Sequence, residues 1–450
     1  MRSIMDYGFL SCVPLIVLIV GALITKRITE MMVLASLVGA ICVYRADFFD
    51  GYIDMLYAGL TNSSYQFILI LLMGFGSMIQ LMQKSGALNG FADKLSGIAR
   101  GKRRTMLTIW CMSFFMFVDD YLNSLTTTFS MRGITDRNGI PREHLSFQVS
   151  LMSASLCVLV PFSSWAAFSI GLIKEQGLAF SDYLRGIPLM FFPLMSIVLC
   201  FLLAAGILPK IGPLKKAYER VEKGGSPVPE DTEGEIAEQG TERGESRSLL
   251  YSVVPIGVLV VTTILCDNDL VHGLLAAIAV QVVLYLGKKL MTLTEFVDCC
   301  FDGMKSMLSL AVIIFFAYVM NEANQTMRFS EFLIDQVSGI ITPELFPLIV
   351  FITVAFCVFA TSGYWVIQVI TVPIFMPLAQ SMDVYLPLVV GAVMSGVTFG
   401  SVCCFYSDVV FMTSAGSQVS NIRQVRTSAP YLLIMVAISA AGYIAAGLLM

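Results

Sequence analysis

Residues 117–128 read FVDDYLNSLTTT, so two adjacent carboxylates, an amide and a run of hydroxyls interrupt an apolar segment that extends from Thr105 to Met131. Placing a charge in a bilayer costs about 2.5–3.5 kcal/mol on insertion scales. An acid inside a membrane segment is therefore a candidate functional group, and Asp119 and Asp120 are the first two candidates.

The composition is that of an integral membrane protein. Of the 450 residues, 57% are hydrophobic and 13% are charged, whereas soluble domains contain about 25% charged residues. The net charge of −4 is small. We expect the lipid bilayer as a partner and no nucleic acid. The first apolar run, residues 9–24, has no small-residue cleavage site after it, so we expect it to be the first span.

Cysteine and histidine usage argues against a metal centre. The eleven cysteines show no C-x-x-C spacing, and the only histidines are His144 and His272. A zinc site or a disulfide framework is therefore not expected. The sequence also lacks the G-x-x-x-x-G-K-[ST] motif of ATP-driven proteins. We expect no cofactor and no enzymatic activity.

The apolar blocks predict about ten membrane spans, two re-entrant helical hairpins and two broken helices. A span needs about 20 residues, but blocks 105–131 and 344–378 are longer and have polar or glycine residues at their centres. We expect each of them to enter the membrane and return to the same side. Blocks 145–173 and 386–414 are the expected broken helices. The predicted fold class is an all-α polytopic membrane protein.

Basic residues set the predicted orientation. With the N-terminus outside, ten crossings and two returning hairpins, 23 Lys and Arg residues lie inside and 5 lie outside, in accordance with the positive-inside rule. A full crossing by block 105–131 would put the basic loops 100–104 and 132–142 on opposite sides. The re-entrant interpretation is therefore favoured. The expected location is the inner membrane, with residues 208–248 in the cytoplasm.

The chain contains the same arrangement twice. Residues 1–207 and 249–450 form two predicted repeats, in which matching blocks lie about 240 residues apart. The first hairpin enters from inside and the second from outside, so the repeats are inverted, which is typical of secondary transporters. The stretch between them, 208–248, is acidic, polar and rich in glycine and proline. We expect it to be a disordered tether.

Four polar breaks, at the centres of the hairpins and the broken helices, are expected to line one site. Breaks of this kind free backbone carbonyls that can bind a cation. The predicted ion- or substrate-binding residues are Asp119, Asp120, Asn123, Ser124, Thr127, Pro161, Ser163, Ser164, Trp165, Thr361, Ser362, Ser407 and Asp408.

Within this set, the predicted ligands of a Na⁺ ion are Asp120, Asn123 and Asp408. Burial favours the protonated form of a carboxylate, so a proton can compete with Na⁺ for the same oxygens. Adjacent helical residues point about 100° apart. We therefore assign a helix cap to Asp119 and the ion to Asp120, which shares a face with Asn123 and Ser124. The reverse assignment stays open.

The polar breaks also have simpler explanations, and other protein classes share some of these features. Membrane hydroxyls often bond back to their own helix, and Trp165 and Trp365 fit plain packing as well as a gate. An intramembrane aspartyl protease also needs two aspartates, but its usual tyrosine-aspartate and glycine-x-glycine-aspartate contexts are absent. A channel is a further alternative, although paired hairpins from opposite faces favour a gated carrier.

Several motifs resemble the NhaC-type sodium/proton antiporter family, which belongs to an ion-transporter superfamily with paired re-entrant hairpins. They are VDDYLNSLT at 118–126, MRGITD at 131–136 and PFSSWAA at 161–167. The second half departs from the family pattern. It has ATSGYW at 360–365, where members tend to carry glycine-threonine-serine-tryptophan, and GSVCCFYSD at 400–408 without the usual aspartate and histidine.

The resemblance implies a secondary transporter that exchanges Na⁺ for H⁺ by alternating access. The alternative is a Na⁺- or H⁺-coupled transporter of a small organic acid or amino acid, because some relatives are thought to carry such solutes and the less polar second half favours them. The expected partners are Na⁺, H⁺, in the alternative a small carboxylate or amino acid, and the bilayer. The sequence leaves a homodimer open.

Overall fold

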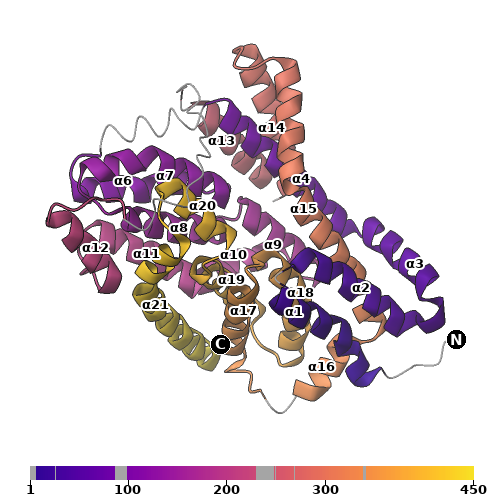
Figure 1. Ribbon diagram of the computed structural model, residues 1–450. Helices are drawn as coiled ribbons and strands as arrows, with labels where there is room; N and C mark the ends of the chain where they lie inside the picture. The colour runs from indigo at the N-terminus through magenta and orange to yellow at the C-terminus, as the bar shows by residue number, and fades with distance from the viewer. Residues whose placement is uncertain are drawn as a thin grey trace.

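The computed structural model describes residues 7–25, 27–86, 99–229, 248, 250–267, 269–337 and 341–450. By length and hydropathy, the described residues contain seven helices that could cross a membrane, or up to nine if each of two bent helix pairs counts as one span. The predicted class, an all-α polytopic membrane protein, is confirmed (Figure 1).

The helices form two bodies, which we call the scaffold and the core (Figure 1). The scaffold consists of α1 (Val13–Thr25), α2 (Ile28–Tyr44), α3 (Phe48–Thr61), α4 (Ser63–Lys84), α13 (Leu250–Leu265), α14 (Leu270–Gly287), α15 (Leu293–Thr326) and α16 (Phe329–Val337). The core consists of α6 (Lys102–Phe115), α7 (Asp120–Arg137), α8 (Arg142–Leu159), α9 (Ser164–Glu175), α10 (Phe180–Gly186), α11 (Phe191–Ala204), α12 (Gly212–Glu222), α17 (Phe346–Thr361), α18 (Tyr364–Ser381), α19 (Leu386–Cys403), α20 (Asp408–Ser417) and α21 (Asn421–Leu449). The two bodies meet chiefly where α4 packs on α9 and where α15 and α16 pack on α18.

Close backbone contact between α4 and α15 holds the scaffold together. The helices cross at Gly76 and Gly303, where a Cβ on either glycine would meet the backbone carbonyl of the other. Small residues allow helix backbones to approach in a membrane, where the hydrophobic effect does not drive helices together. The crossing therefore joins the two halves of the chain within the scaffold.

Helices α8 and α19 form the centre of the core. All 18 residues of α8 are buried, and α19 is buried along most of its length. Small residues recur in both helices, as serine in α8 and as glycine and serine in α19, so neighbouring helices can pack closely around them. Helix α8 lies against α6, α7, α11 and α20, and α19 lies against α17 and α18.

The predicted hairpin blocks are helix pairs that break at their centres. Helices α6 and α7 flank residues 116–119, and α17 and α18 flank residues 362–363. With 14 residues, α6 spans about 21 Å and is shorter than the roughly 30 Å hydrocarbon layer. The predicted broken helices are also observed, as α8 followed by α9 and α19 followed by α20.

The breaks recur at a constant spacing. Helix α7 begins at Asp120 and α18 at Tyr364, 244 residues later. Helix α9 begins at Ser164 and α20 at Asp408, again 244 residues later. This register allows each position around the site in the first half to be compared with its counterpart in the second half.

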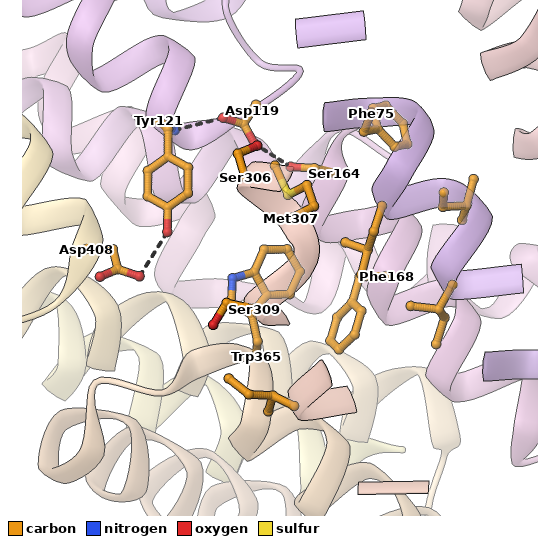
Figure 2. Close-up of a pocket in the computed structure, with 14 residues that line it drawn as sticks. Phe75, Asp119, Tyr121, Ser164, Phe168, Ser306, Met307, Ser309, Trp365 and Asp408 are labelled. Atoms are coloured by element: carbon orange, nitrogen blue, oxygen red, sulfur yellow. Dashed lines mark hydrogen bonds between the residues drawn. The ribbon is translucent and has the colours of Figure 1, made fainter. Parts of the chain in front are cut away.

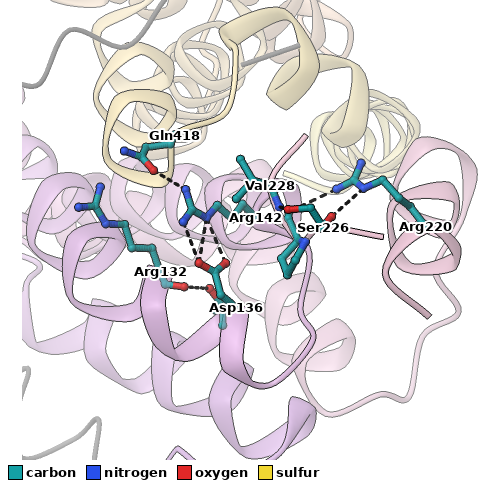
Figure 3. A network of polar contacts seen from close by, with 9 residues as sticks. Arg132, Asp136, Arg142, Arg220, Ser226, Val228 and Gln418 are labelled. Carbon is teal, nitrogen blue, oxygen red and sulfur yellow. Dashed lines mark hydrogen bonds and ion pairs between the residues drawn. The ribbon is translucent and has the colours of Figure 1, made fainter. Parts of the chain in front are cut away.

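One end of the core, which we call the basic face, gathers Lys102, Arg142, Arg220 and Arg423 from four different helices. Arg142 donates to Asp136 at 2.7 Å and to Gln418 at 2.5 Å (Figure 3).

Each of the other three cations also has a carboxylate partner. Arg220 donates to Glu143 at 2.8 and 3.0 Å, and Arg423 lies 3.6 Å from the same carboxylate. The Lys102 ammonium, 3.1 Å from Glu222, lowers the pKa of that carboxyl through a hydrogen bond and its charge.

The predicted tether 208–248 is ordered in its first part. Residues 212–222 form α12, which packs on α8 and α21 with Leu214, Ala217 and Tyr218 buried. The expectation of disorder is wrong for this helix, because its apolar residues recur at i, i+3 and i+4 and give it a face to bury. Residues 230–247 lie outside the described residues.

Candidate ion-binding site

Asp119 caps α7. Its Oδ1 atom accepts hydrogen bonds from the backbone N–H groups of Tyr121 (3.0 Å) and Leu122 (3.1 Å), and its Oδ2 atom accepts one from the Ser164 hydroxyl at 3.0 Å. The capping geometry expected for Asp119 is therefore observed. The bond to Ser164 also links the tip of the first hairpin to the first broken helix.

Asp120 lies deeper and is 1% exposed. Its Oδ1 atom accepts a hydrogen bond from the Trp165 indole N–H at 2.9 Å. Its Oδ2 atom has no hydrogen-bond partner among the described residues. A buried carboxylate oxygen without a partner is energetically costly, so this atom is available for a proton or a cation.

Asp408 is the first residue of α20, and Tyr121 connects it to the first half. The Tyr121 hydroxyl donates to Asp408 Oδ2 at 2.8 Å, while the backbone N–H of the same tyrosine donates to Asp119. Figure 2 shows the tyrosine ring between the two carboxylates. One residue therefore joins acids from both halves.

A cavity of about 190 Å³ opens beside these residues, between the core and the scaffold. Asp119, Tyr121, Ser164, Trp365 and Asp408 line it from the core (Figure 2). From the scaffold, α4 contributes apolar side chains, and α15 contributes Ser306, Met307, Ser309 and Ile313. None of the 14 lining residues is Lys, Arg or His.

Aromatic rings separate Asp120 from direct contact with this cavity. Trp165 is fully buried and stacks on Tyr364, with 4.3 Å between ring centroids. Trp365 lies 5.6 Å from the Trp165 ring and itself lines the cavity. Because Trp165 also donates to Asp120, a shift of this stack would change the access of the carboxylate to the cavity.

Equivalent serines cap the second helix of each broken pair. Ser163 Oγ accepts from the Ala166 N–H at 3.1 Å and donates to the Cys157 carbonyl. Ser407 Oγ accepts from the Val410 N–H at 3.3 Å and donates to the Ser401 carbonyl. Both hydroxyls are thus occupied in holding the break, and neither serine lines the cavity.

Three further predicted residues of α7 are fully buried and do not line the cavity: Asn123, Ser124 and Thr127. Asn123 donates to the Ser113 carbonyl at 3.1 Å and accepts from the Thr127 hydroxyl at 3.1 Å. Ser124 donates to Ser153 at 3.2 Å. These three residues hold the hairpin tip against the core.

The second hairpin tip is held by local bonds. Thr361 Oγ1 donates to the Cys357 carbonyl at 2.7 Å and accepts from the Gly363 N–H at 3.2 Å. Ser362 has a φ of 56°, which ends α17 in the left-handed region. Neither Thr361 nor Ser362 lines the cavity, and half-buried Pro161 in the first broken helix does not line it either.

Among the residues that line the cavity but were not predicted from the sequence are Tyr121 and the α15 residues Ser306, Met307 and Ser309. A signal existed for Tyr121, because a tyrosine hydroxyl in an apolar segment needs a hydrogen-bond partner. The α15 serines gave only a weak signal, because membrane hydroxyls often bond back to their own helix, as Ser306 does to the Gly303 carbonyl.

Comparison with known proteins defines the family. Residues 156–448, more than half of the chain, match the Na⁺/H⁺ antiporter family. The chain belongs to this family. The expected relationship is thereby confirmed, and the protein is a secondary transporter, not an enzyme. The matched range of this antiporter-family protein includes Trp165 and Asp408 but begins after Asp119 and Asp120.

Three further proteins each align with at least 90% of this antiporter-family chain. An uncharacterized protein of Haemophilus influenzae is 25% identical over 482 residues, which cover 97% of this chain and 90% of that protein. The YdaH transporter of Alcanivorax borkumensis has a similar fold, with a TM-score of 0.61 at 12% identity over 90% of this chain and 89% of that one. MtrF of Neisseria gonorrhoeae aligns over 97% of both chains at 12% identity with a TM-score of 0.49.

Among the described residues, no group of three or more His, Cys, Asp and Glu side chains is placed to hold a metal ion. The predicted Na⁺ ligands Asp120, Asn123 and Asp408 bring only two carboxylates and an amide, whose oxygen already accepts from Thr127. Hydroxyl or carbonyl oxygens of the breaks would have to complete a Na⁺ site.

Proposed function

We propose that this protein is a Na⁺/H⁺ antiporter that works by alternating access, with Asp120 and Asp408 as the groups that carry the ions. Na⁺ binds when the carboxylates are ionised, and a proton displaces it from the same oxygens. One site then carries either ion but not both, which is the minimum requirement for obligatory exchange.

The observation that carries this proposal is the unpartnered Oδ2 atom of buried Asp120. Both oxygens of Asp119 already accept hydrogen bonds, Oδ1 from the backbone of α7 and Oδ2 from Ser164. Asp408 uses one oxygen to accept from Tyr121 and is exposed at the cavity. Asp120 and Asp408 therefore each keep one oxygen that accepts no hydrogen bond from the described residues.

The position of the cavity supports alternating access. It lies at the contact between the core and the scaffold, and α9 and α18, the core helices at this contact, each begin at one of the breaks. Relative movement of the two bodies would open the site to one side and then to the other. The lining contains carboxylates and no basic side chain, so its charge favours a cation.

A small amino acid is the second candidate solute, because a volume of about 190 Å³ exceeds the roughly 30 Å³ that one water occupies in the liquid. An ammonium group suits the Asp119 and Asp408 carboxylates. A simple organic acid fits less well, since its charge would find only backbone N–H groups at helix N-termini.

We also propose that the basic face is cytoplasmic and that the protein lies in the inner membrane with its N-terminus outside. The core brings together Lys102, Arg142, Arg220 and Arg423, all of which belong to segments expected inside. The positive-inside rule assigns such a face to the cytoplasm.

The test is proton movement in proteoliposomes that contain a pH-sensitive dye. Addition of Na⁺ is expected to drive protons across the membrane, and Asp120→Asn and Asp408→Asn are each expected to reduce the rate at least tenfold. Asp298→Asn, which removes an exposed acid of α15, is the matched control. If Na⁺ moves no protons while a labelled amino acid accumulates on a Na⁺ gradient, the second candidate replaces the first.

A further inference from the structure

A row of buried hydroxyls leads from Asp120 toward the basic face; we call Ser124, Ser153, Ser150 and Ser146 the hydroxyl row. The three serines of α8 are 0–3% exposed. At 100° per residue they lie within about 60° of one another around the helix axis. They therefore form one polar line on a helix that is buried along its whole length.

The inner end of the hydroxyl row lies next to Asp120 along helix α7. Ser124 lies one turn after Asp120 on the same helix face, and its hydroxyl donates to the Ser153 hydroxyl at 3.2 Å. Ser150 lies almost one turn before Ser153 in α8, on the side of the basic face. Its Oγ atom is buried and, like Asp120 Oδ2, has no hydrogen-bond partner among the described residues.

The outer end of the row reaches the first turn of α21. Ser146 donates to Gln424 Oε1, which also accepts from Thr413 at 3.0 Å and from Ser414 at 2.7 Å. One turn further out on α8, Arg142 marks the basic face (Figure 3). Ser153 in turn donates to the backbone carbonyl of Ser150 at 3.2 Å. The row thus contains hydrogen bonds at Ser124, Ser153 and Ser146, and single helical turns separate its other members.

The second half of the chain lacks this row. At a spacing of 244 residues, the counterparts of the three α8 serines are Val390, Met394 and Val397, all buried on α19. The core helices α8 and α19 occupy equivalent positions in the two halves, but their buried side chains differ. A polar line leads to the site from the basic face, whereas its counterpart on α19 is apolar.

We propose that the hydroxyl row passes protons between the basic face and Asp120 by a path separate from the solute cavity. This inference rests on the proposed function in that Asp120 carries the transported proton. A hydroxyl can accept one hydrogen bond and donate another. A hydronium ion in the water at the basic face gives a proton to Ser146 and becomes neutral water. Each hydroxyl oxygen then gains a proton from its outer neighbour and releases its own inward, and the last O–H bond forms at Asp120 Oδ2.

The chemistry of the row suits a proton better than Na⁺. A metal ion needs several oxygen ligands at once, and the row offers hydroxyls in single file. The Arg142 guanidinium also lies at its outer end. Na⁺ would use the cavity, where the Asp119 and Asp408 carboxylates lie. The two ions would therefore reach the site by different routes.

The first experiment compares Ser150→Val and Ser153→Val, which introduce an apolar side chain of the kind present on α19. Na⁺-driven proton movement is expected to fall at least tenfold, while exchange of labelled Na⁺ for Na⁺, which needs no proton, stays within twofold. Ser150→Ala, which removes the same hydroxyl without added bulk and breaks no hydrogen bond, is expected to show the same decrease. Ser155→Val is the matched control, because Ser155 is equally buried and unpartnered but faces the opposite side of α8.

The proton path would be refuted if both valine variants left proton movement unchanged. If Asp120→Asn still abolished exchange, the proposed function would stand.

A second measurement does not depend on Na⁺ transport. The infrared band of the protonated Asp120 carboxyl, assigned by its loss in Asp120→Asn, is followed after transfer from H₂O to D₂O at acidic pH. Ser150→Val is expected to slow deuteration at least tenfold, and Ser155→Val to leave it unchanged. Equal rates in all forms would refute the path even if the protein carried a solute other than Na⁺.

Discussion

Tyr121 donates from its backbone to Asp119 and from its hydroxyl to Asp408, a residue 287 positions later in the chain. This tyrosine therefore connects acids from the two halves of the chain. Tyr364, the counterpart of Asp120 in the second half, lies 3.5 Å from the same hydroxyl. At equivalent positions of the two halves, the first half therefore has the Asp120 carboxylate and the second half has the Tyr364 hydroxyl.

Tyr121→Phe is expected to weaken Na⁺ binding about tenfold without unfolding the protein. Hydrogen bonds to charged groups contribute about 1.5–3 kcal/mol, and a tenfold change corresponds to 1.4 kcal/mol. The measurement is the Na⁺ concentration that gives half-maximal proton movement. Tyr183→Phe is the control, since it removes a buried hydroxyl bonded to the Val158 carbonyl and should lower stability without changing the Na⁺ dependence. Equal Na⁺ dependence in Tyr121→Phe and the unmodified protein would contradict a role for this bond.

Asp119 and Asp120 are expected to separate into a structural and an ion-carrying residue. Asparagine is a good helix cap, so Asp119→Asn should keep α7 intact and retain measurable exchange. Asp119→Ala should lower the free energy of unfolding by about 1 kcal/mol. Thermal unfolding in detergent, together with exchange rates, would show the difference from Asp120→Asn. Loss of exchange in Asp119→Asn at unchanged stability would reverse the assignment.

The arrangement of helices could be predicted from the sequence because its signals are local. Polar breaks inside apolar blocks marked both hairpins and both broken helices, and the spacing of those breaks is the same in the two halves. The ordered helix α12 was missed because glycine, proline and charges dominate the stretch around it. Its three buried residues, Leu214, Ala217 and Tyr218, are a short pattern that becomes informative only against α8 and α21.

Of the residues that line the cavity, Asp119, Ser164 and Asp408 belong to the predicted set, whereas the other lining residues do not. The capping role of Asp119 follows from its place before a helix, which is a local property. The lining by Ser306 and Ser309 depends on where α15 packs, and the contact between Tyr121 and Asp408 depends on how α20 packs on α7. No periodicity in one segment reports such long-range contacts.

The ion pair between Arg220 and Glu143 is expected to fasten α12 to the core. Glu143 is 1% exposed, so removal of its partner leaves a buried charge, which costs about 3–5 kcal/mol when no other group compensates. Arg423, 3.6 Å from the same carboxylate, should reduce that cost. We expect Arg220→Ala to lower the melting temperature clearly and Glu143→Gln combined with Arg220→Gln to recover part of the loss. The exposed pair of Lys102 and Glu222 is the control, because surface pairs contribute about 0–1 kcal/mol.

Gly76→Leu is expected to disrupt the scaffold, because any side chain at this position would meet the backbone carbonyl of Gly303. Helices α4 and α15 would have to separate, which removes the close packing that associates helices in a membrane. The expected result is a large loss of folded protein, measured as the monodisperse fraction in detergent and as the melting temperature. Gly257→Leu, in α13, is the matched control, since no atom lies within 4 Å of a Cβ built there. If both variants remained equally stable, the contact between Gly76 and Gly303 would not be what holds α4 against α15.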